Sequence, residues 1–518
     1  MEKWRGRVQR LCICAALALT LCVLLGFAVC GLLETAVLHS GERGTEQIDF
    51  VRDSLGLNLA ATAALIALLL GLSRLVRGRR GQRALLGVCA ALTAAAMAFL
   101  LGAGTRQTYD TAAVLEAAQL FAQGNYKAMQ LDYFHVYSYQ LGLCLPMEIV
   151  LRLFPGLDIN LFMQGLGVVL SAASAAMLAV LAGEVFGGRA AAGSTLLLGA
   201  LFLPALLYPV FTYSTLPMLF CVTAGLLCFA RYLRTRRARD GIAYAVMMAL
   251  GYMLKPNAAL AILVTVICAL LDALGRGRAR VLLYAALAAV LGAALARTAI
   301  WQYELRSGVT LTEDVSMLAR LVMGLQEGGA QAGWYNSYTQ QFFPRTVTAQ
   351  QEHAVALADL VARLHEMAAQ PAMTADFFGR KLLSQWLEPT CATLWYGQLG
   401  GQSGPLAVLA QAVYAQGGAV RTALEAYMNV FQQALYLLAC VGLLALLWRG
   451  ASCAQLLLPL TVLGGVLYHG IFEAKSQYAF IYLMLLLPVA AQGLVALEAC
   501  IGALWDKRRR KRHGTENG

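Results

Sequence analysis

Residues 11–33 read LCICAALALTLCVLLGFAVCGLL, an uncharged stretch that is long enough to cross a membrane as a helix. Similar runs recur along the chain, in which 59% of the 518 residues are hydrophobic and 13% are charged. A water-soluble domain of ordinary composition cannot bury that much apolar surface. The first run has a basic start, as signal peptides do, but it is longer and lacks a small-residue cleavage site, so we expect a retained helix.

The apolar runs define the predicted fold class, an all-α polytopic membrane protein with about twelve transmembrane helices. Each run approaches the ~20 helical residues that a ~30 Å hydrocarbon core requires. The expected spans are residues 11–33, 56–73, 84–103, 160–186, 193–211, 214–230, 241–254, 258–274, 281–300, 427–448, 453–472 and 477–500.

Clusters of lysine and arginine set the expected orientation. With the amino terminus in the cytoplasm, every dense basic cluster falls on the cytoplasmic side, as the positive-inside rule requires. We therefore expect a multi-pass protein of the cell membrane with both termini in the cytoplasm. The formal charge of +12 then signals topology and not a nucleic-acid partner. The clusters are residues 74–83, 231–239, 276–280 and 507–512.

Two segments, residues 104–159 and 301–426, are then placed on the non-cytoplasmic side. Loops of this length in a compact protein are usually functional. The second has apolar residues at helical spacing over 350–367, so we expect interfacial helices that cap the bundle. The expected units are an extra N-terminal pair of spans at 1–83, a core at 84–500 and a basic tail at 501–518.

The cysteine and histidine residues indicate neither a disulfide framework nor a metal site. Nearly all of the 13 cysteines lie in apolar runs, where cysteine acts as a small hydrophobe. No cluster of histidine, cysteine and carboxylate has metal-ligand spacing. The sequence thus requires no cofactor, and a divalent metal has no support in it.

Asp110 is the first acidic residue after the third span, and an aromatic-rich segment follows it at residues 132–142. A carboxylate at the membrane surface beside aromatic rings could form a sugar-binding shelf. The alternative is a helix cap, in which Asp110 accepts the free N–H groups of the next helix. Asp132 is a second candidate, for positioning an acceptor or orienting a metal, and a solvated loop carboxylate is its alternative. His135 could equally be a hydrogen-bonded structural residue.

Three basic residues, Lys255, Arg297 and Lys475, map to the external membrane level. Lys255 stands in the sequence Leu-Lys-Pro-Asn between two short spans, where the proline ends a helix. Cations at this depth suit the phosphate of a lipid whose tail stays in the bilayer. Snorkelling of long side chains to the interface is the alternative for each residue alone. Their convergence on the face that bears Asp110 favours a site.

These motifs together resemble the GT-C superfamily of membrane glycosyltransferases, in the branch of the dolichyl-phosphate-mannose protein mannosyltransferases and bacterial family-39-type enzymes. The resemblance rests on Asp110, on the Tyr-Ser-Tyr-Gln-Leu-Gly sequence of 137–142, on 252–257 and on the Glu-Ala-Lys-Ser-Gln-Tyr sequence of 473–478. Relatives often place arginine before that last tyrosine, where this chain has Gln477, so Lys475 is the nearest substitute.

The resemblance implies an inverting transfer of a monosaccharide from a polyprenyl-phosphate donor to an acceptor hydroxyl at the extracytoplasmic face. Asp110 would be the catalytic base. Aromatics beside tight-turn glycines, such as Trp334 and Tyr335, could stack on sugars or simply pack the loop. The complete expected site contains Asp110 and Asp132 as catalytic residues, Lys255, Arg297, Lys475 and Tyr478 at the donor phosphate, and Tyr109, His135, Tyr139, Gln140, Glu473, Trp334 and Tyr335 at the substrate.

Three other interpretations remain open at this stage. A secondary transporter also often has twelve spans, but it should place polar groups around a midplane cavity and usually shows an internal repeat. A ligase or polymerase that uses a pyrophosphate-linked glycan should concentrate arginine and histidine in the large loop. Arg320, Arg345, His353 and His365 are such residues. A scaffold without activity is the third.

Overall fold

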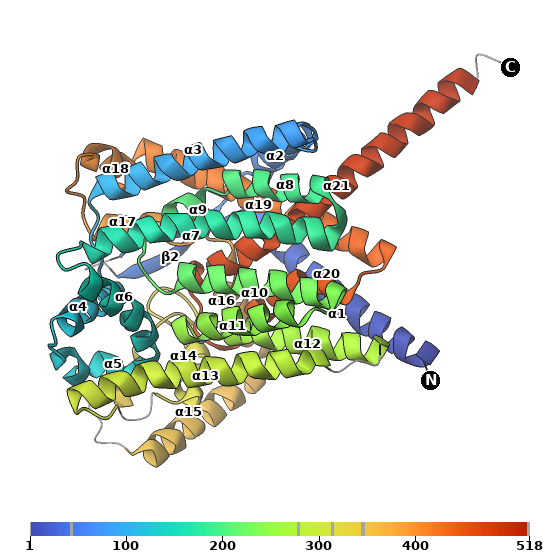
Figure 1. Ribbon diagram of the computed structural model, residues 1–518. Helices are drawn as coiled ribbons and strands as arrows, with labels where there is room; N and C mark the ends of the chain where they lie inside the picture. Colours follow the sequence, from blue (N-terminus) through green and yellow to red (C-terminus); the bar gives the residue numbers. More distant parts are fainter. Residues whose placement is uncertain (1, 42–44, 277–279, 312–314, 343–347, 515–518) are drawn as a thin grey trace.

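The computed structural model describes residues 2–41, 45–276, 280–311, 315–342 and 348–514. It is a bundle of long helices whose two termini lie at the same end (Figure 1). Ten helices of the described chain are long and apolar enough to span a membrane. They are α1 (Glu2–Leu33), α2 (Leu55–Leu75), α3 (Arg79–Ala103), α7 (Ile159–Ala182), α10 (Thr215–Thr235), α12 (Ala258–Arg276), α13 (Arg280–Ser307), α19 (Ala419–Arg449), α20 (Cys453–Ile471) and α21 (Ser476–Gly514).

Each of the twelve expected runs coincides with a helical segment, and two of them depart from a simple span. The run at 193–211 is a pair, α8 (Arg189–Leu201) and α9 (Leu203–Leu207) with the short helix η5 (Tyr208–Val210), bent by 62°. Pro204 and Pro209 lack the N–H groups that a continuous helix would need there. The run at 241–254 is α11 (Ala238–Leu254), which has only 17 residues.

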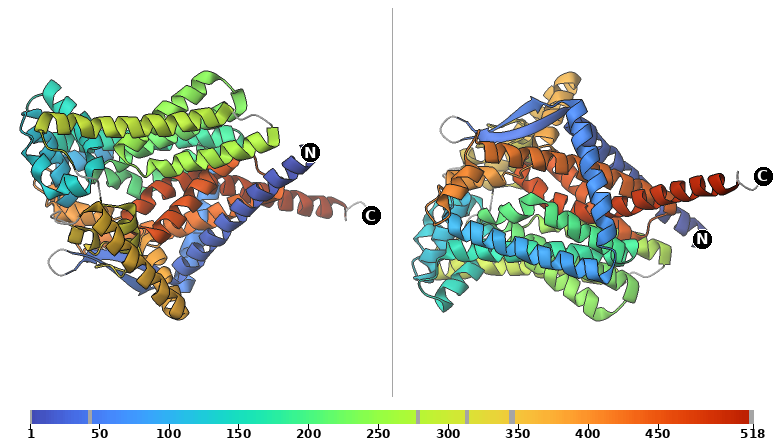
Figure 2. Two further views of the ribbon diagram at one scale, coloured as in Figure 1. Left: turned by 90° about the horizontal axis from the view of Figure 1, so that it is seen from below. Right: turned by 90° about the horizontal axis from the view of Figure 1, so that it is seen from above.

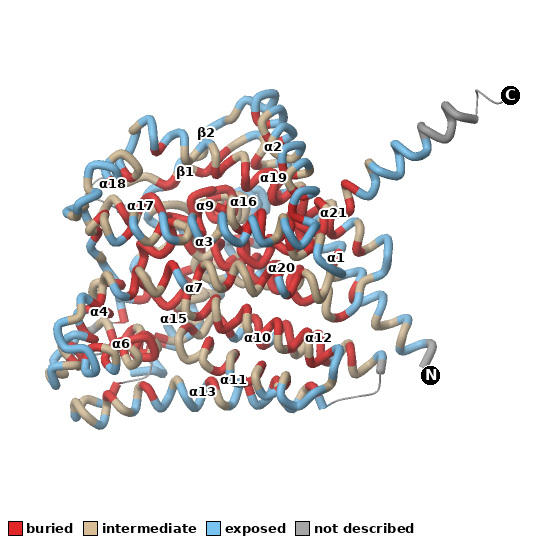
Figure 3. Tube along the Cα trace, turned by 45° about the horizontal axis from the view of Figure 1, so that its top comes forward, coloured by how far each residue is buried: buried red, intermediate tan, exposed pale blue. Residues whose placement is uncertain are grey.

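The last helix forms the centre of the bundle. In an apolar stretch of 18 residues within α21, 89% of the residues are buried. The corresponding stretches of α2 and α3 have only 17% of their residues buried (Figure 3). The α19 and α21 backbones meet at Gly442 and Gly493. A Cβ at Gly493 would lie 1.8 Å from the carbonyl oxygen of Leu438, and one at Gly442 would lie 2.2 Å from that of Val489. Small residues here allow the close contact that holds membrane helices together.

Gly493→Ala should therefore destabilise the protein by about 1–3 kcal/mol, because backbone carbonyls cannot move aside as a flexible side chain can. The measurement is thermal unfolding of the purified protein in detergent. Gly502→Ala on the same helix is the matched control, since a Cβ there meets nothing within 4 Å. Equal unfolding temperatures for the two variants would contradict this packing.

The remaining short helices gather largely at the end of the bundle opposite the termini, as α4, α6 and α18 show in Figure 1 and as both views of Figure 2 confirm. The expected loop helix at 350–367 is α15 (Ala349–Ala369), which begins with a capping box of Thr348 and Gln351. The others are α4 (Tyr109–Ala122), η2 (Lys127–Gln130), α5 (Asp132–Val136), η3 (Ser138–Gln140), α6 (Leu141–Leu153), α14 (Met317–Gly324), η6 (Tyr338–Phe342), α16 (Pro371–Trp386), α17 (Thr393–Leu399) and α18 (Ala407–Tyr414).

A β-hairpin between α1 and α2 was not expected from the sequence. Its strands β1 (Glu34–Ser40) and β2 (Glu46–Arg52) pair antiparallel, from Glu34 opposite Arg52 to Ser40 opposite Glu46. Two hydrogen bonds to the main chain of β1 fix the hairpin to the large loop and α19: Ala36 N donates to Leu387 O, and the Arg421 side chain donates to Leu38 O. The N-terminal pair of spans therefore contributes to the same end of the bundle as α4.

Candidate active site

Asp110 lies in the first turn of α4, where the chain leaves α3. Thr108 is the N-cap residue, and the exposed Asp110 makes no capping hydrogen bond with the described residues. Its neighbour Tyr109 has a φ of 51°, a left-handed conformation that is uncommon for a bulky residue and concentrates at functional sites. The geometry thus leaves the carboxylate free for a role other than capping.

Three other segments place further charges around Asp110. The surrounding protein desolvates its carboxyl group and raises its pKa, against the opposing effect of Lys475 and Lys255, while Glu46 adds to the increase. Burial likewise raises the pKa of Glu473 to about 7. The charge of Lys475 opposes this increase, and the charges of Glu46 and Asp110 add to it. The site is therefore a mixed cluster of carboxylates and cations drawn from α4, β2, the α11–α12 break and the α20–α21 loop.

Lys255 sits at the break between α11 and α12 and is only 6% exposed. Its Nζ donates to Thr215 Oγ1 at 3.0 Å and lies 5.0 Å from the ring centroid of Tyr213 and 5.5 Å from that of Tyr478. Burial lowers the pKa of this ammonium group to about 8, although Glu473 and Asp110 act in the other direction. Lys255 is thus a cation held among aromatic rings, and no carboxylate of the described residues is in direct contact with it.

Lys475 forms an ion pair with Glu46, with 2.6 Å between Nζ and Oε1. Burial alone would lower its pKa, but Glu46 and the neighbouring Tyr396 and Glu473 hold it well above the usual value. Gln477, which stands where relatives often have arginine, accepts a hydrogen bond from the Tyr396 hydroxyl. That amide therefore orders the aromatic neighbour of Lys475.

Arg320 of α14 is a third cation of the site. Its guanidinium donates to Val136 O at 2.9 Å and stacks over the rings of Tyr137 and Tyr139, 5.6 and 6.0 Å from their centroids. It also lowers the pKa of Glu473. From the sequence, Arg320 supports only the alternative of a ligase or polymerase. Nothing in the sequence of a long loop indicates which arginine folds back onto the bundle.

A group of tyrosines surrounds the charges. The Asp110 charge raises the pKa of each ring hydroxyl in the group, in addition to the larger effect of burial on all of them. Within the described residues, the buried hydroxyl of Tyr133 has no hydrogen-bond partner, as expected of a group that binds a ligand or water. The group consists of Tyr133, Tyr137, Tyr139, Tyr213 and Tyr335.

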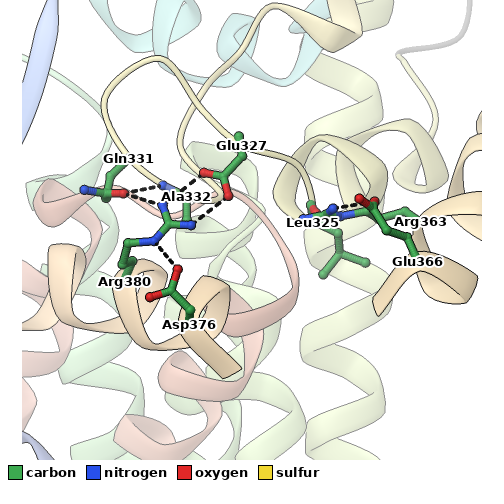
Figure 4. Close-up of polar contacts among 8 residues, drawn as sticks. All are labelled: Leu325, Glu327, Gln331, Ala332, Arg363, Glu366, Asp376 and Arg380. Atoms are coloured by element: carbon green, nitrogen blue, oxygen red, sulfur yellow. Dashed lines mark hydrogen bonds and ion pairs between the residues drawn. The ribbon is translucent and has the colours of Figure 1, made fainter. Parts of the chain in front are cut away.

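The large loop is fixed against the site by ion pairs on its outer side. Arg380 of α16 bridges Glu327 and Asp376 with N–O distances of 2.8 Å, and it also donates to Gln331 (Figure 4). The segment that leads to Tyr335 is thereby held beside the α20–α21 loop, where Ala474 N donates to Gly333 O. These contacts place the loop tyrosine next to Glu473.

Lys381 of α16 joins the large loop to the helical bundle. It is completely buried, and its ammonium donates to the carbonyl oxygens of Gly324 and Ile471, which end α14 and α20. Glu388 is buried as well and accepts the backbone N–H groups of Thr390 and Ala392. Both residues hold the loop to the bundle.

Several sequence-predicted residues lie apart from the charges or play another part. Arg297 forms an ion pair with Glu304 on the exposed surface of α13 and is not among the charges that shift the pKa of Asp110. Trp334 is 1% exposed and donates to Ser384, so its indole packs against protein instead of facing solvent. Gln140 is buried and donates to the hydroxyl of Tyr213.

The other predicted residues lie within or beside the site. Tyr478 lies beside Lys255, and its hydroxyl is 3.4 Å from Glu473 Oε1. His135 is half-buried in α5. Asp132 begins α5, but its side chain lies outside the described part of the structure. In the described chain, no group of three or more His, Cys, Asp or Glu residues could hold a metal ion.

These features define a polytopic integral membrane protein with a charged, aromatic-lined site at one end of its bundle. The chain belongs to the family described as Conserved hypothetical integral membrane protein, whose model matches residues 72–496. None of the curated proteins compared with the chain matches it.

Two solved structures are similar at low identity. One is the archaeal oligosaccharyltransferase AglB from Archaeoglobus fulgidus in complex with an inhibitory peptide and a dolichol-phosphate, at 12% identity and a TM-score of 0.39 over 85% of this chain. The chain spans about half of the AglB chain, 52%. The other is ArnT from Cupriavidus metallidurans bound to undecaprenyl phosphate, at 13% identity and a TM-score of 0.32 over 79% of this chain and 77% of that one.

Proposed function

We propose that this protein is an inverting glycosyltransferase of the GT-C type, which moves a monosaccharide from a polyprenyl-phosphate donor to an acceptor hydroxyl at the extracytoplasmic face. The observation that carries the proposal is the convergence of Asp110 with Lys255 and Lys475, three residues from distant segments whose charges act on one another. The basic clusters beside the other end of the spans support the proposed orientation.

The proposed reaction uses each of these groups once. Asp110 accepts the proton of the acceptor hydroxyl as that oxygen attacks the anomeric carbon. The bond between the anomeric carbon and the phosphate oxygen breaks, and the polyprenyl phosphate leaves with the bonding electrons. Lys255 and Lys475 stabilise the negative charge that develops on the leaving phosphate. One displacement inverts the anomeric configuration.

We propose that the lipid tail lies in an apolar groove between α3 and α7. A cavity of about 570 Å³ lies between α3 and α7 and is lined by Met97, Leu101, Phe162 and Leu166 among others. Leu166 also lines a separate void of about 10 Å³ on whose wall Tyr213 lies, and the Lys255 Nζ is 5.0 Å from the centroid of that ring. A polyprenyl chain in this groove would keep its isoprene units in the bilayer and its phosphate beside Lys255.

A second candidate function is transfer from a pyrophosphate-linked glycan. Arg320 favours it, because a third cation in the site suits a leaving group with a higher negative charge. Arg345, which also belonged to that interpretation, lies outside the described residues. The exposed His353 and His365 both lie on α15.

The test is turnover by the purified protein in liposomes with a panel of lipid donors and envelope acceptors. The proposal predicts release of polyprenyl phosphate from a monophosphate-linked sugar. Turnover of pyrophosphate-linked glycans alone would establish the second candidate. Solute flux into the liposomes without turnover of any donor would instead identify a transporter.

Binding of the leaving lipid should depend on pH. Above pH 7 the Glu473 carboxyl loses its proton, and near pH 8 Lys255 begins to lose its charge, so both changes weaken the attraction for a phosphate. Affinity for undecaprenyl phosphate should therefore fall as the pH rises from 6 to 9. Glu473→Gln should remove the decrease in affinity near pH 7. We expect that decrease to be about fivefold, which corresponds to ~1 kcal/mol for one partly solvated charge. A pH dependence identical to wild type would remove Glu473 from the site.

A further inference from the structure

The β1–β2 hairpin brings an acidic residue to the site from outside the region that the family model covers. That region is residues 72–496, whereas β2 begins at Glu46. Glu46 is paired with Ser40 at the tip of the hairpin, and Gln398 of α17 contacts the Ser40 side chain at 3.5 Å. Together with the hydrogen bonds to the β1 main chain, this contact holds the Ser40–Glu46 end of the two strands against the α16–α17 region.

Glu46 contacts Lys475 in a setting that is largely closed to water. The side chains of the two residues are 15% and 17% exposed, and Nζ and Oε1 are 2.6 Å apart. At low exposure an ion pair is screened weakly, so its loss leaves an uncompensated buried charge. The hairpin therefore determines the state of a lysine that belongs to the α20–α21 loop.

The two lysines of the site provide an internal comparison. Both are desolvated, and each lies close enough to the other for its charge to act on it. Lys255 has no carboxylate in ion-pair contact among the described residues, and its pKa falls to about 8. Lys475 has Glu46, and its pKa rises well above the usual value. The carboxylate from the hairpin is the clearest difference between their surroundings.

We propose that Glu46 is a positioning residue, which keeps the Lys475 ammonium charged and aimed into the site for a phosphate group of the ligand. An ammonium group has three N–H donors. Glu46 contacts this group directly, and the charges of Glu473 and Asp110 also act on it. The identity of the ligand, a polyprenyl phosphate, rests on the proposed function, but the effect of Glu46 on Lys475 does not.

Other groups also face Lys475 and must be considered in any titration. They are Tyr396 from α17, Glu473 from the same loop, Asp110 from α4 and Lys255 from the α11–α12 break. Glu46 is the one among them in direct ion-pair contact. Replacing it should therefore have a larger effect than a change in the protonation of Glu473.

The first experiment measures the lysine without any lipid. Purified wild type and Glu46→Gln are labelled with acetic anhydride between pH 7 and 11, and the peptide that contains Lys475 is quantified by mass spectrometry. Lys475 labelling should reach its midpoint below pH 9 in the variant, as expected for a buried lysine without a paired carboxylate, and should stay incomplete up to pH 11 in wild type, which is more than a tenfold change in the proton equilibrium. Asp49→Asn is the matched control, because Asp49 is an exposed carboxylate on the same strand that pairs with His39.

An unchanged midpoint in Glu46→Gln, or an equal shift in Asp49→Asn, would overturn the proposal. Glu46→Asp adds a second test, since a shortened carboxylate should restore part of the wild-type midpoint if charge is what matters. Thermal unfolding of all three variants identifies any that are misfolded. If Glu46→Gln is misfolded, Glu46→Asp decides the question, and its Lys475 midpoint should lie below that of wild type.

The second experiment measures binding of undecaprenyl phosphate at pH 7 and pH 9. At pH 7 wild type and Glu46→Gln should bind the lipid with similar affinity. The variant loses a negative charge that repels the phosphate, and this gain offsets the poorer positioning of Lys475. At pH 9 Glu46→Gln should bind about tenfold more weakly than wild type, as its Lys475 becomes neutral. Tighter binding by the variant at both pH values would instead make Glu46 a competitor of the phosphate. If wild type binds no undecaprenyl phosphate, the proposed function fails, and the labelling result still decides the role of Glu46.

Discussion

Asp110→Asn should lower the rate of sugar transfer by about 10²–10⁴-fold, the usual contribution of a general base. Asparagine keeps the size of the side chain but cannot accept the proton of the acceptor hydroxyl. The affinity for the donor should not fall, because removing a negative charge does not weaken the attraction between the lysines and a phosphate. The measurement is kcat with a saturating donor, alongside the Kd for undecaprenyl phosphate.

Glu116→Gln is the matched control for this prediction. Glu116 is an exposed carboxylate on the same helix, α4, and it is not among the charges that shift the pKa of Asp110. It should retain the wild-type rate. If Asp110→Asn kept half of the wild-type activity, another group would have to be the base. The raised pKa of Asp110 adds a further expectation: activity is lost as the pH falls through that value, because the protonated acid cannot accept a proton.

Lys475→Met should have the second large effect, a loss of about 100-fold in kcat/KM. Truncating one member of a buried charge pair typically costs 2–5 kcal/mol, and ~2.7 kcal/mol corresponds to 100-fold. Methionine has a similar length but no charge, so it cannot stabilise the departing phosphate. The loss should appear in both kcat and KM, because the lysine contacts the phosphate before and during bond cleavage.

Arg297→Gln is the control for the lysine variant. From the sequence, Arg297 appeared equivalent to Lys255 and Lys475, but it pairs with Glu304 on an exposed face of α13. Its replacement should change activity less than twofold, in keeping with the small value of exposed ion pairs. Equal losses for Arg297→Gln and Lys475→Met would mean that both cations are required and would contradict the distinction drawn between them.

The helical bundle could be predicted from the sequence because a membrane span depends on length and apolar composition, which are local properties. Each expected run is a helix, and the expected break after Leu254 is present. The bend in the 193–211 run was missed although Pro204 and Pro209 were visible, because proline is tolerated within many membrane helices. The hairpin was missed because two seven-residue strands between apolar helices leave a weak pattern in the sequence.

The site could be predicted where the chemistry stands at the end of a helix. Asp110, Lys255 and Lys475 are polar residues next to apolar runs, so their depth follows from the sequence. The depth of a residue does not show which side of its helix the side chain is on. Arg297 has the expected depth but lies on an exposed face of α13. The contributions of Glu46 and Arg320 depend on how the hairpin and the large loop fold back onto the bundle, which no local pattern determines.

A structure of the protein with a non-cleavable polyprenyl-phosphate sugar analogue tests the central claim most directly. The account predicts the phosphate within hydrogen-bonding distance of the Lys475 and Lys255 ammonium groups, with the anomeric carbon facing Asp110 and the isoprene chain along the α3–α7 groove. A phosphate bound elsewhere, with Asp110 and both lysines still contacting only protein, would contradict it.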